Sequence, residues 1–150
     1  MKPNQKSEIQ GQLFNHPWLE LLSKAPPMFS AIFYALIIGI LLTIAFVKNV
    51  PGDFATGILL YVVALIFWTL FEYLAHRYIF HLDHYFPDYP MAHRISHIFH
   101  GIHHDYPRDT HRLIMPPVPG LLIISILFFT GQIIMGKLIF VCLSGFLTGY

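Results

Sequence analysis

Long apolar runs constrain the fold of this chain more than any other feature of its sequence. Residues 28–47 carry no charge and are about as long as a helix that crosses a bilayer. Residues 55–81 form a longer run, which at about 1.5 Å per residue reaches roughly 40 Å and should project beyond the hydrocarbon core. A third run, residues 118–135, follows two prolines and is of about minimal length. These runs predict transmembrane helices at 28–47, 55–75 and 118–135.

A fourth apolar run, residues 138–150, follows Gly136 and Lys137, which leave room only for a tight reversal. A helix needs about 20 residues to cross a bilayer, and this run is shorter. Either the segment lies on the membrane surface, or the sequence is a truncated copy of a longer protein. We favour truncation, with residues 138–150 as part of a fourth span.

The composition agrees with a membrane protein. Only 11% of the residues are charged and 55% are hydrophobic, whereas soluble domains carry about 25% charged residues. The net charge of +1 gives no reason to expect a nucleic-acid partner. The single cysteine, Cys142, excludes an intrachain disulfide and most thiolate metal sites. We therefore expect an all-α integral membrane protein with about four transmembrane helices.

The lysines and arginines predict the orientation, because cytoplasmic segments are rich in them. Seven lie in the N-terminal segment or in the connection between the second and third runs: Lys2, Lys6, Lys24, Arg77, Arg94, Arg108 and Arg112. The other two connections hold one each, Lys48 and Lys137. We expect one domain over residues 1–150, with a cytosolic segment at 1–27 and a cytosolic, histidine-rich helical cap at 76–117.

This cap holds nine of the ten histidines of the chain, between His76 and His111. The stretch MAHRISHIFHGIHH, residues 91–104, has helical spacing, which places His100, His103 and His104 on one side of a helix. Three imidazoles on one edge can chelate iron, zinc or manganese. His97 precedes His100 by three residues and is a further candidate ligand. We interpret His84, His93 and His111 as loop or supporting residues, and His16 as a membrane-surface residue.

A second histidine pair ends the second apolar run. His76 and His81 lie five apart, or about 140° around an ideal helix, so a straight helix cannot direct both to one ion. They suit two different ions, or a helix that unwinds at its end. Glu72 lies one turn before His76 and could accept its second ring proton, although an interfacial carboxylate paired with an arginine is an equally good interpretation.

These motifs resemble a known family. HRYIFH (residues 76–81) followed by HGIHHDYPRDTHRLIMPPVP (residues 100–119) is similar to the fatty acid 2-hydroxylase branch of the membrane fatty acid hydroxylase and sterol desaturase superfamily. The HGxHH box with its P-x-D and RL-x-MPP continuation carries most of the resemblance, which extends over roughly residues 71–150.

The resemblance implies a membrane-bound di-iron mono-oxygenase that uses O2 to hydroxylate the 2-position of fatty acids or sphingolipid acyl chains, with zinc as a substitute metal. It assigns metal ligation to His76, His81, His100, His103 and His104. It also implies that one further segment shapes the entrance for the substrate: Arg112, Leu113, Met115, Pro116 and Pro117. The aromatic residues Tyr73, Tyr78, Tyr85, Tyr89, Phe80 and Phe99 would line a lipid passage or form an interfacial belt.

The chain departs from the family pattern in two respects. The family has His-x3-His and His-x2-His-His boxes after the fourth span, which the sequence ends before, so we expect an incomplete metal centre and no catalysis from this polypeptide alone. No cytochrome b5 module with a His-Pro-Gly-Gly segment precedes the first run. A separate electron donor is therefore expected, of the cytochrome b5 type or a ferredoxin with its reductase.

Other function classes fit the sequence less well. A sterol or carotenoid hydroxylase or desaturase of the same superfamily is the closest alternative. A metal transporter with a histidine-rich loop would need polar ligands at mid-membrane depth, and the first and third runs have no Asp, Glu or His there. A b-type haem protein would need histidines that face each other inside the bilayer.

Overall fold

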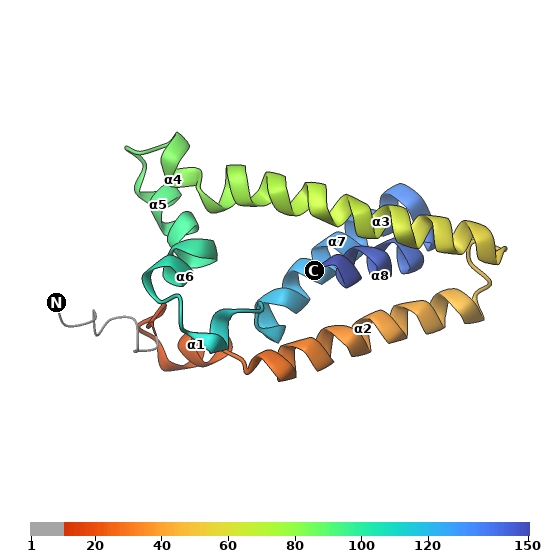
Figure 1. The fold of residues 1–150 in the computed structure, drawn as a ribbon, viewed down its shortest axis with the longest axis horizontal. Helices are drawn as coiled ribbons and strands as arrows, with labels where there is room; N and C mark the ends of the chain where they lie inside the picture. Colours follow the sequence, from red (N-terminus) through yellow and green to blue (C-terminus); the bar gives the residue numbers. More distant parts are fainter. Residues whose placement is uncertain (1–10) are drawn as a thin grey trace.

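The structure is a computed structural model that describes residues 11–150, apart from the side chains of Phe99 and His103. Within this range it is helical and contains no β-strand, which confirms the all-α prediction (Figure 1). Lys2 and Lys6, which entered the prediction of orientation, lie outside the described residues.

Three long helices match the predicted runs to within one residue at every end. They are α2 (Pro27–Val47), α3 (Phe54–Ala75) and α7 (Pro117–Met135). Proline occupies the first turn of α2 and α7, where its missing N–H breaks no helical hydrogen bond. Three helical stretches are long and apolar enough to cross a membrane: Pro27–Val47, Phe54–Phe80 and Thr110–Gly149.

Large apolar side chains cover the outside of these helices. Phe46, Phe54 and Ile133 are each more than four-fifths exposed. A soluble protein does not leave so many apolar side chains in water, and the pattern is that of helices that are apolar all round. The exposed surface therefore supports a lipid environment for the bundle.

The last helix, α8 (Ile139–Gly149), packs mainly against α3 and α2. It follows a tight reversal through the 3-10 turn η5 (Gly136–Leu138), where Gly136 adopts a positive φ. Seven of its 11 residues are buried, and Leu143, Phe146 and Leu147 belong to the hydrophobic core. The alternative of a helix lying on the membrane surface is therefore wrong. The count of four spans stays a prediction.

The connections between the long helices lie at two opposite ends of the molecule (Figure 1). The α2–α3 and α7–α8 turns, with Lys48 and Lys137, lie at one end. The helix α1 (Pro17–Leu22) and the histidine-rich segment lie at the other end. The connections predicted to be rich in lysine and arginine thus lie at one end of the fold, and the connections with one lysine each lie at the other end.

The histidine-rich segment is a chain of short helical turns. In order these are η2 (His76–Phe80), α4 (Leu82–Tyr85), α5 (Pro90–Ser96), η3 (His97–Gly101), α6 (Ile102–Asp105) and η4 (Thr110–Arg112). Two of them, η2 and η3, are π-helical turns. Residues 91–104 are helical as predicted, but the helix is not straight because η3 interrupts it.

Candidate metal centre

The first histidine pair is brought together by the π turn at the end of α3. A π turn closes hydrogen bonds between residues five apart and has more residues per turn than an α-helix, so residues i and i+5 lie much closer to the same side than they do in an α-helix. The rings of His76 and His81 have centroids 5.1 Å apart. Of the two interpretations left open by the sequence, a helix that changes its winding at its end is the one found here.

A second π turn, η3, precedes the other histidine group. It ends at Gly101, and α6 follows with His103 and His104. The His100 and His104 rings have centroids 4.4 Å apart. The side chain of His103 is outside the described residues, so its predicted role as a ligand stays a prediction.

The two histidine groups meet. The His100 ring centroid lies 4.4 Å from that of His76 and 5.2 Å from that of His81. Ring nitrogens of these three residues all lie within 4.8 Å of one another. Nitrogens that share a tetrahedral ion are about 3.4 Å apart at usual metal–nitrogen lengths. Three convergent imidazoles suit a first-row transition metal, so the donor set fits the metal that the sequence implies.

His104 joins the edge of this cluster. Its ring centroid lies 5.8 Å from that of His81, but His104 is not part of the His76, His81 and His100 group. The Phe80 ring stacks on His100 with centroids 5.7 Å apart and planes 18° apart. Sequence reasoning placed Phe80 only in a passage or an aromatic belt, because ring packing against a histidine 20 positions away leaves no signal in local spacing.

The short helices α4 and α5 hold the two π turns against each other. The backbone N–H of Asp83 donates to Oγ of Ser96 at 3.0 Å, and Ser96 is buried. The Ser96 side chain also interacts with the Asp83 carboxyl group, and this interaction outweighs desolvation and lowers the pKa of that carboxyl below its ordinary value. Ser96 directly precedes η3. This contact therefore positions the His100 segment beside η2, a role that sequence analysis did not assign to either residue.

Two other histidines of this segment make contacts of their own. Nδ1 of His97 is 3.8 Å from a carboxylate oxygen of Asp105, and both side chains are about half exposed. A ring nitrogen of His93 lies 2.7 Å from the carbonyl oxygen of Pro87. Neither residue belongs to the His76, His81 and His100 group. Ligation by His97 stays a prediction.

Glu72 lines an open cleft of about 700 Å³ beside the cluster. The same cleft is lined by His76, His81 and His84. A carboxylate one turn before His76 is thus on the correct face of α3 to orient that ring. Its role stays a prediction, because no hydrogen bond between the two side chains is established.

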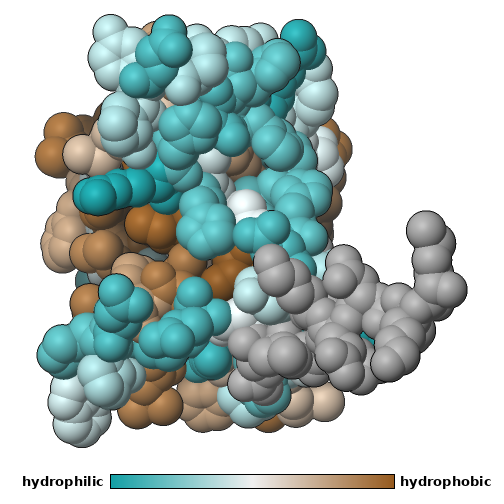
Figure 2. All heavy atoms as spheres, turned by 90° about the vertical axis from the view of Figure 1, so that its left-hand side faces the viewer, coloured by the Kyte–Doolittle hydropathy of each residue, from teal (hydrophilic) through white to brown (hydrophobic). Residues whose placement is uncertain are grey.

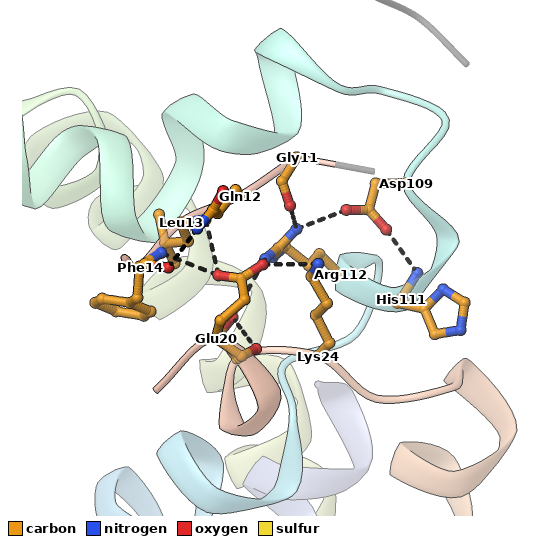
Figure 3. A network of polar contacts seen from close by, with 10 residues as sticks. Gly11, Gln12, Leu13, Phe14, Glu20, Lys24, Asp109, His111 and Arg112 are labelled. Atoms are coloured by element: carbon orange, nitrogen blue, oxygen red, sulfur yellow. Dashed lines mark hydrogen bonds and ion pairs between the residues drawn. The ribbon is translucent and has the colours of Figure 1, made fainter. Parts of the chain in front are cut away.

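Arg112, predicted near the substrate entrance, is the centre of a buried network (Figure 3). Its guanidinium donates to Oε1 of Glu20 at 2.6 Å, Oδ2 of Asp109 at 2.7 Å and the Gly11 carbonyl at 2.5 Å. Its side chain is only 6% exposed. The network binds residues 11–24 to the segment that follows α6.

The rest of the predicted entrance is held by the membrane helices. Tyr34 in α2 donates to the Met115 carbonyl at 3.0 Å, and the Met115 N–H donates to the Tyr150 hydroxyl at 2.6 Å. Pro116 is the N-cap of α7, whereas the Leu113 side chain is exposed. These contacts fix the path of the segment from residue 112 to 117, and its role toward substrate stays a prediction.

Comparison with known proteins identifies relatives of one kind. No protein-family model matches the chain. The chain is 39% identical over 98 residues to the ceramide very long chain fatty acid hydroxylase of Schizosaccharomyces pombe, a match that covers 65% of this chain and 28% of the relative. It is 36% identical over 94 residues to human fatty acid 2-hydroxylase, which covers 62% of this chain and 23% of the relative.

A solved structure shows the same arrangement of helices. The structure described as full-length scs7p, with only the hydroxylase domain visible, matches with a TM-score of 0.68 and 28% identity. The match covers 89% of this chain and 50% of that chain. The matched segments thus span about a quarter of the curated relatives and half of the solved chain. The resemblance to fatty acid 2-hydroxylases that the histidine motifs predicted is confirmed.

Proposed function

We propose, from its kinship with fatty acid 2-hydroxylases, that this chain provides part of a membrane-bound mono-oxygenase that hydroxylates acyl chains at carbon 2. The curated relatives are named as hydroxylases of fatty acids and of ceramide or dihydroceramide acyl groups. A fatty acid or sphingolipid acyl chain is therefore the proposed substrate. Residues 1–150 are proposed to form one domain, with a fourth span that includes α8.

The observation that carries this proposal is the convergence of His76, His81 and His100. Two segments separated by almost 20 residues direct imidazoles to one place, and both do so next to a π turn. π turns are rare and occur frequently at functional sites. We propose that these three residues, with His103 and His104, hold two iron ions, and that zinc can replace them.

The bound metal would supply the O2 chemistry that an unactivated C–H bond requires. The protein would hold and orient the imidazoles. Glu72 would fix the ring orientation of His76 from within the cleft, as carboxylates commonly do beside metal-bound histidines. Phe80, stacked on His100, would limit the rotation of that ring.

The location of the site suits a lipid substrate. His76 lies just after the end of α3, among the last residues of the apolar stretch Phe54–Phe80, so an acyl chain could remain in the bilayer while its head reaches the cluster. Hydrophilic side chains cover this end of the molecule, with hydrophobic ones visible between two hydrophilic zones (Figure 2). The excess of Lys and Arg at this end supports a cytoplasmic location, where a separate electron donor would bind.

Metal titration tests the site. The chain in detergent or nanodiscs is titrated with Co2+, whose absorption spectrum reports imidazole ligation. We expect His100→Ala to weaken binding at least about tenfold, because the ligand shared by both histidine groups is lost. His16→Ala, in which an exposed histidine outside the cluster is changed, is the matched control.

The activity is tested on the longest natural reading frame that contains this chain, supplied with iron, O2 and a reductant. Formation of 2-hydroxy acyl products is expected, and hydroxylated sterol or carotenoid products instead would assign the chain to the alternative branch. Equal Co2+ affinity for the wild-type and His100→Ala proteins would refute the proposed ligand set.

A further inference from the structure

Arg77 lies directly beside the candidate ligands. It follows His76 in η2 and lines the same cleft of about 700 Å³ as His76 and His81. Its side chain is exposed, so it is available to a molecule that enters the cleft. A permanently charged guanidinium and the candidate metal ligands therefore line one cleft.

Tyrosines hold the Arg77 guanidinium in place. Its Nη1 donates to the Tyr73 hydroxyl at 2.6 Å, and its central carbon lies 6.0 Å from the Tyr73 ring centroid and 5.5 Å from that of Tyr78. These are cation–π distances. The tyrosines orient the guanidinium without adding a negative charge, and most of its five N–H donors are left for another acceptor.

No carboxylate neutralises this arginine among residues 11–150. Every ion pair found in that range joins other residues, and Arg112 alone takes part in two. Glu72 lines the cleft, but none of the ion pairs among residues 11–150 joins it to Arg77. An arginine that is oriented by tyrosines and paired with no carboxylate among these residues is suited to bind an anion from outside the chain.

The chemistry of the proposed reaction specifies where the anion must be. Carbon 2 of an acyl chain is bonded directly to the carbon of its carboxyl group. If carbon 2 is to reach the histidine cluster, the carboxyl oxygens must therefore bind within a few ångströms of it. Arg77 is the arginine of this cleft, and a guanidinium binds a carboxylate through two parallel hydrogen bonds.

We propose that Arg77 binds the carboxylate of a free fatty acid, so that the substrate of this chain enters as an anion and not as a neutral amide. This inference rests on the proposed function of the histidine site. Glu72 repels a carboxylate, so the head of the substrate is placed on the Arg77 side of the cleft, with the acyl chain directed along α3.

Binding of palmitate and of palmitamide, its neutral amide analogue, tests the proposal. The whole chain is placed in nanodiscs, empty nanodiscs correct for partition into lipid, and radiolabelled ligand is titrated without metal. We expect palmitate to bind at least about tenfold more tightly than palmitamide, since a hydrogen-bonded charge pair is lost with the amide. Arg77→Gln should remove this preference, and Arg77→Lys should retain part of it because the charge remains.

Arg94→Gln is the matched control, since Arg94 is exposed on α5 and does not line the cleft. It should bind palmitate as the wild type does. The inference is overturned if the wild type binds both ligands equally, or if Arg77→Gln and Arg94→Gln give the same palmitate affinity. Because these titrations contain no metal, the two failures can be told apart. Equal Co2+ affinity of the wild type and His100→Ala would refute the metal site, whereas loss of the palmitate preference measured here would refute the role of Arg77.

Discussion

At the scale of single residues, Arg112 and Glu20 connect the N-terminal segment to the histidine-rich end. Glu20 accepts hydrogen bonds from the backbone N–H groups of Leu13 and Phe14, both at 2.9 Å, and from Arg112. Lys24 forms an ion pair with the same carboxylate at 2.7 Å. Removal of one partner from such a buried pair commonly costs about 3–5 kcal/mol, because the other charge is left uncompensated.

This network predicts sensitivity to acid. Desolvation raises the pKa of Glu20, but hydrogen bonds from Lys24, Phe14, Leu13 and Arg112 outweigh it and lower the pKa to about 2. Since the folded-state pKa lies below the unfolded value, the stabilisation is complete above about pH 5 and is lost as the pH falls toward 2. The linked free energy is on the order of 3 kcal/mol.

Amide hydrogen exchange of Leu13 and Phe14, corrected for intrinsic rates, measures this effect. We expect the protection of both amides to fall between pH 5 and pH 2, and Glu20→Gln to lower it already at pH 7. Asp88→Asn, a change of an exposed carboxylate, serves as the control. Protection that does not depend on pH in the wild type would contradict the assigned role of Glu20.

At the scale of elements, the two π turns decide which histidines meet. Spacing on an ideal helix correctly predicted that His100 and His104 share one side. The same rule left His76 and His81 unresolved, because 100° per residue separates residues five apart. The winding of a helix end depends on its contacts with other segments, such as the packing of η2 against α5 and η3. The local sequence therefore predicted which histidines are candidate ligands, but not the π turn that brings His76 and His81 together.

Removal of the second histidine of the pair tests the π turn. In the π turn the His81 ring lies beside His76 and His100, so His81→Ala should lower Co2+ affinity at least about tenfold. If the segment instead winds as an α-helix in solution, His81 lies about 140° around the helix from His76 and cannot reach the same ion. In that case His81→Ala should bind Co2+ as tightly as the wild type.

At the scale of the whole molecule, α8 lies at the centre of the bundle. A Cβ at Gly145 would overlap the backbone carbonyl of Tyr61, and one at Gly149 would overlap the Trp68 side chain. Such close approach through small residues is typical of packed membrane helices. The apolar runs predicted where the spans begin and end, since length and composition suffice for that. They did not predict that residues 139–149 pack against both α2 and α3, because this depends on complementary shapes of segments far apart in sequence.

A substitution at this contact predicts a loss of stability. Gly145→Ala places a methyl group against the rigid backbone of α3, which must move, so we expect destabilisation of about 1–3 kcal/mol. Gly39→Ala is the matched control, because a Cβ there meets no atom within 4 Å. Thermal unfolding in detergent should show a lower midpoint for Gly145→Ala than for Gly39→Ala, and equal midpoints would show that α3 and α8 are not in close contact.

The π turns at His76–Phe80 and His97–Gly101 couple the winding of the helix to the binding of a metal ion. A metal ion that binds the gathered imidazoles should stabilise the π turns. By thermodynamic reciprocity, a condition that converts these turns to α-helix should lower the metal affinity by the same factor. A mismatch between bilayer thickness and the apolar length of α3 would favour tilting or kinking of that helix, and would so affect its final turn. Through this coupling, the thickness of the surrounding bilayer would change the metal affinity of the histidine site.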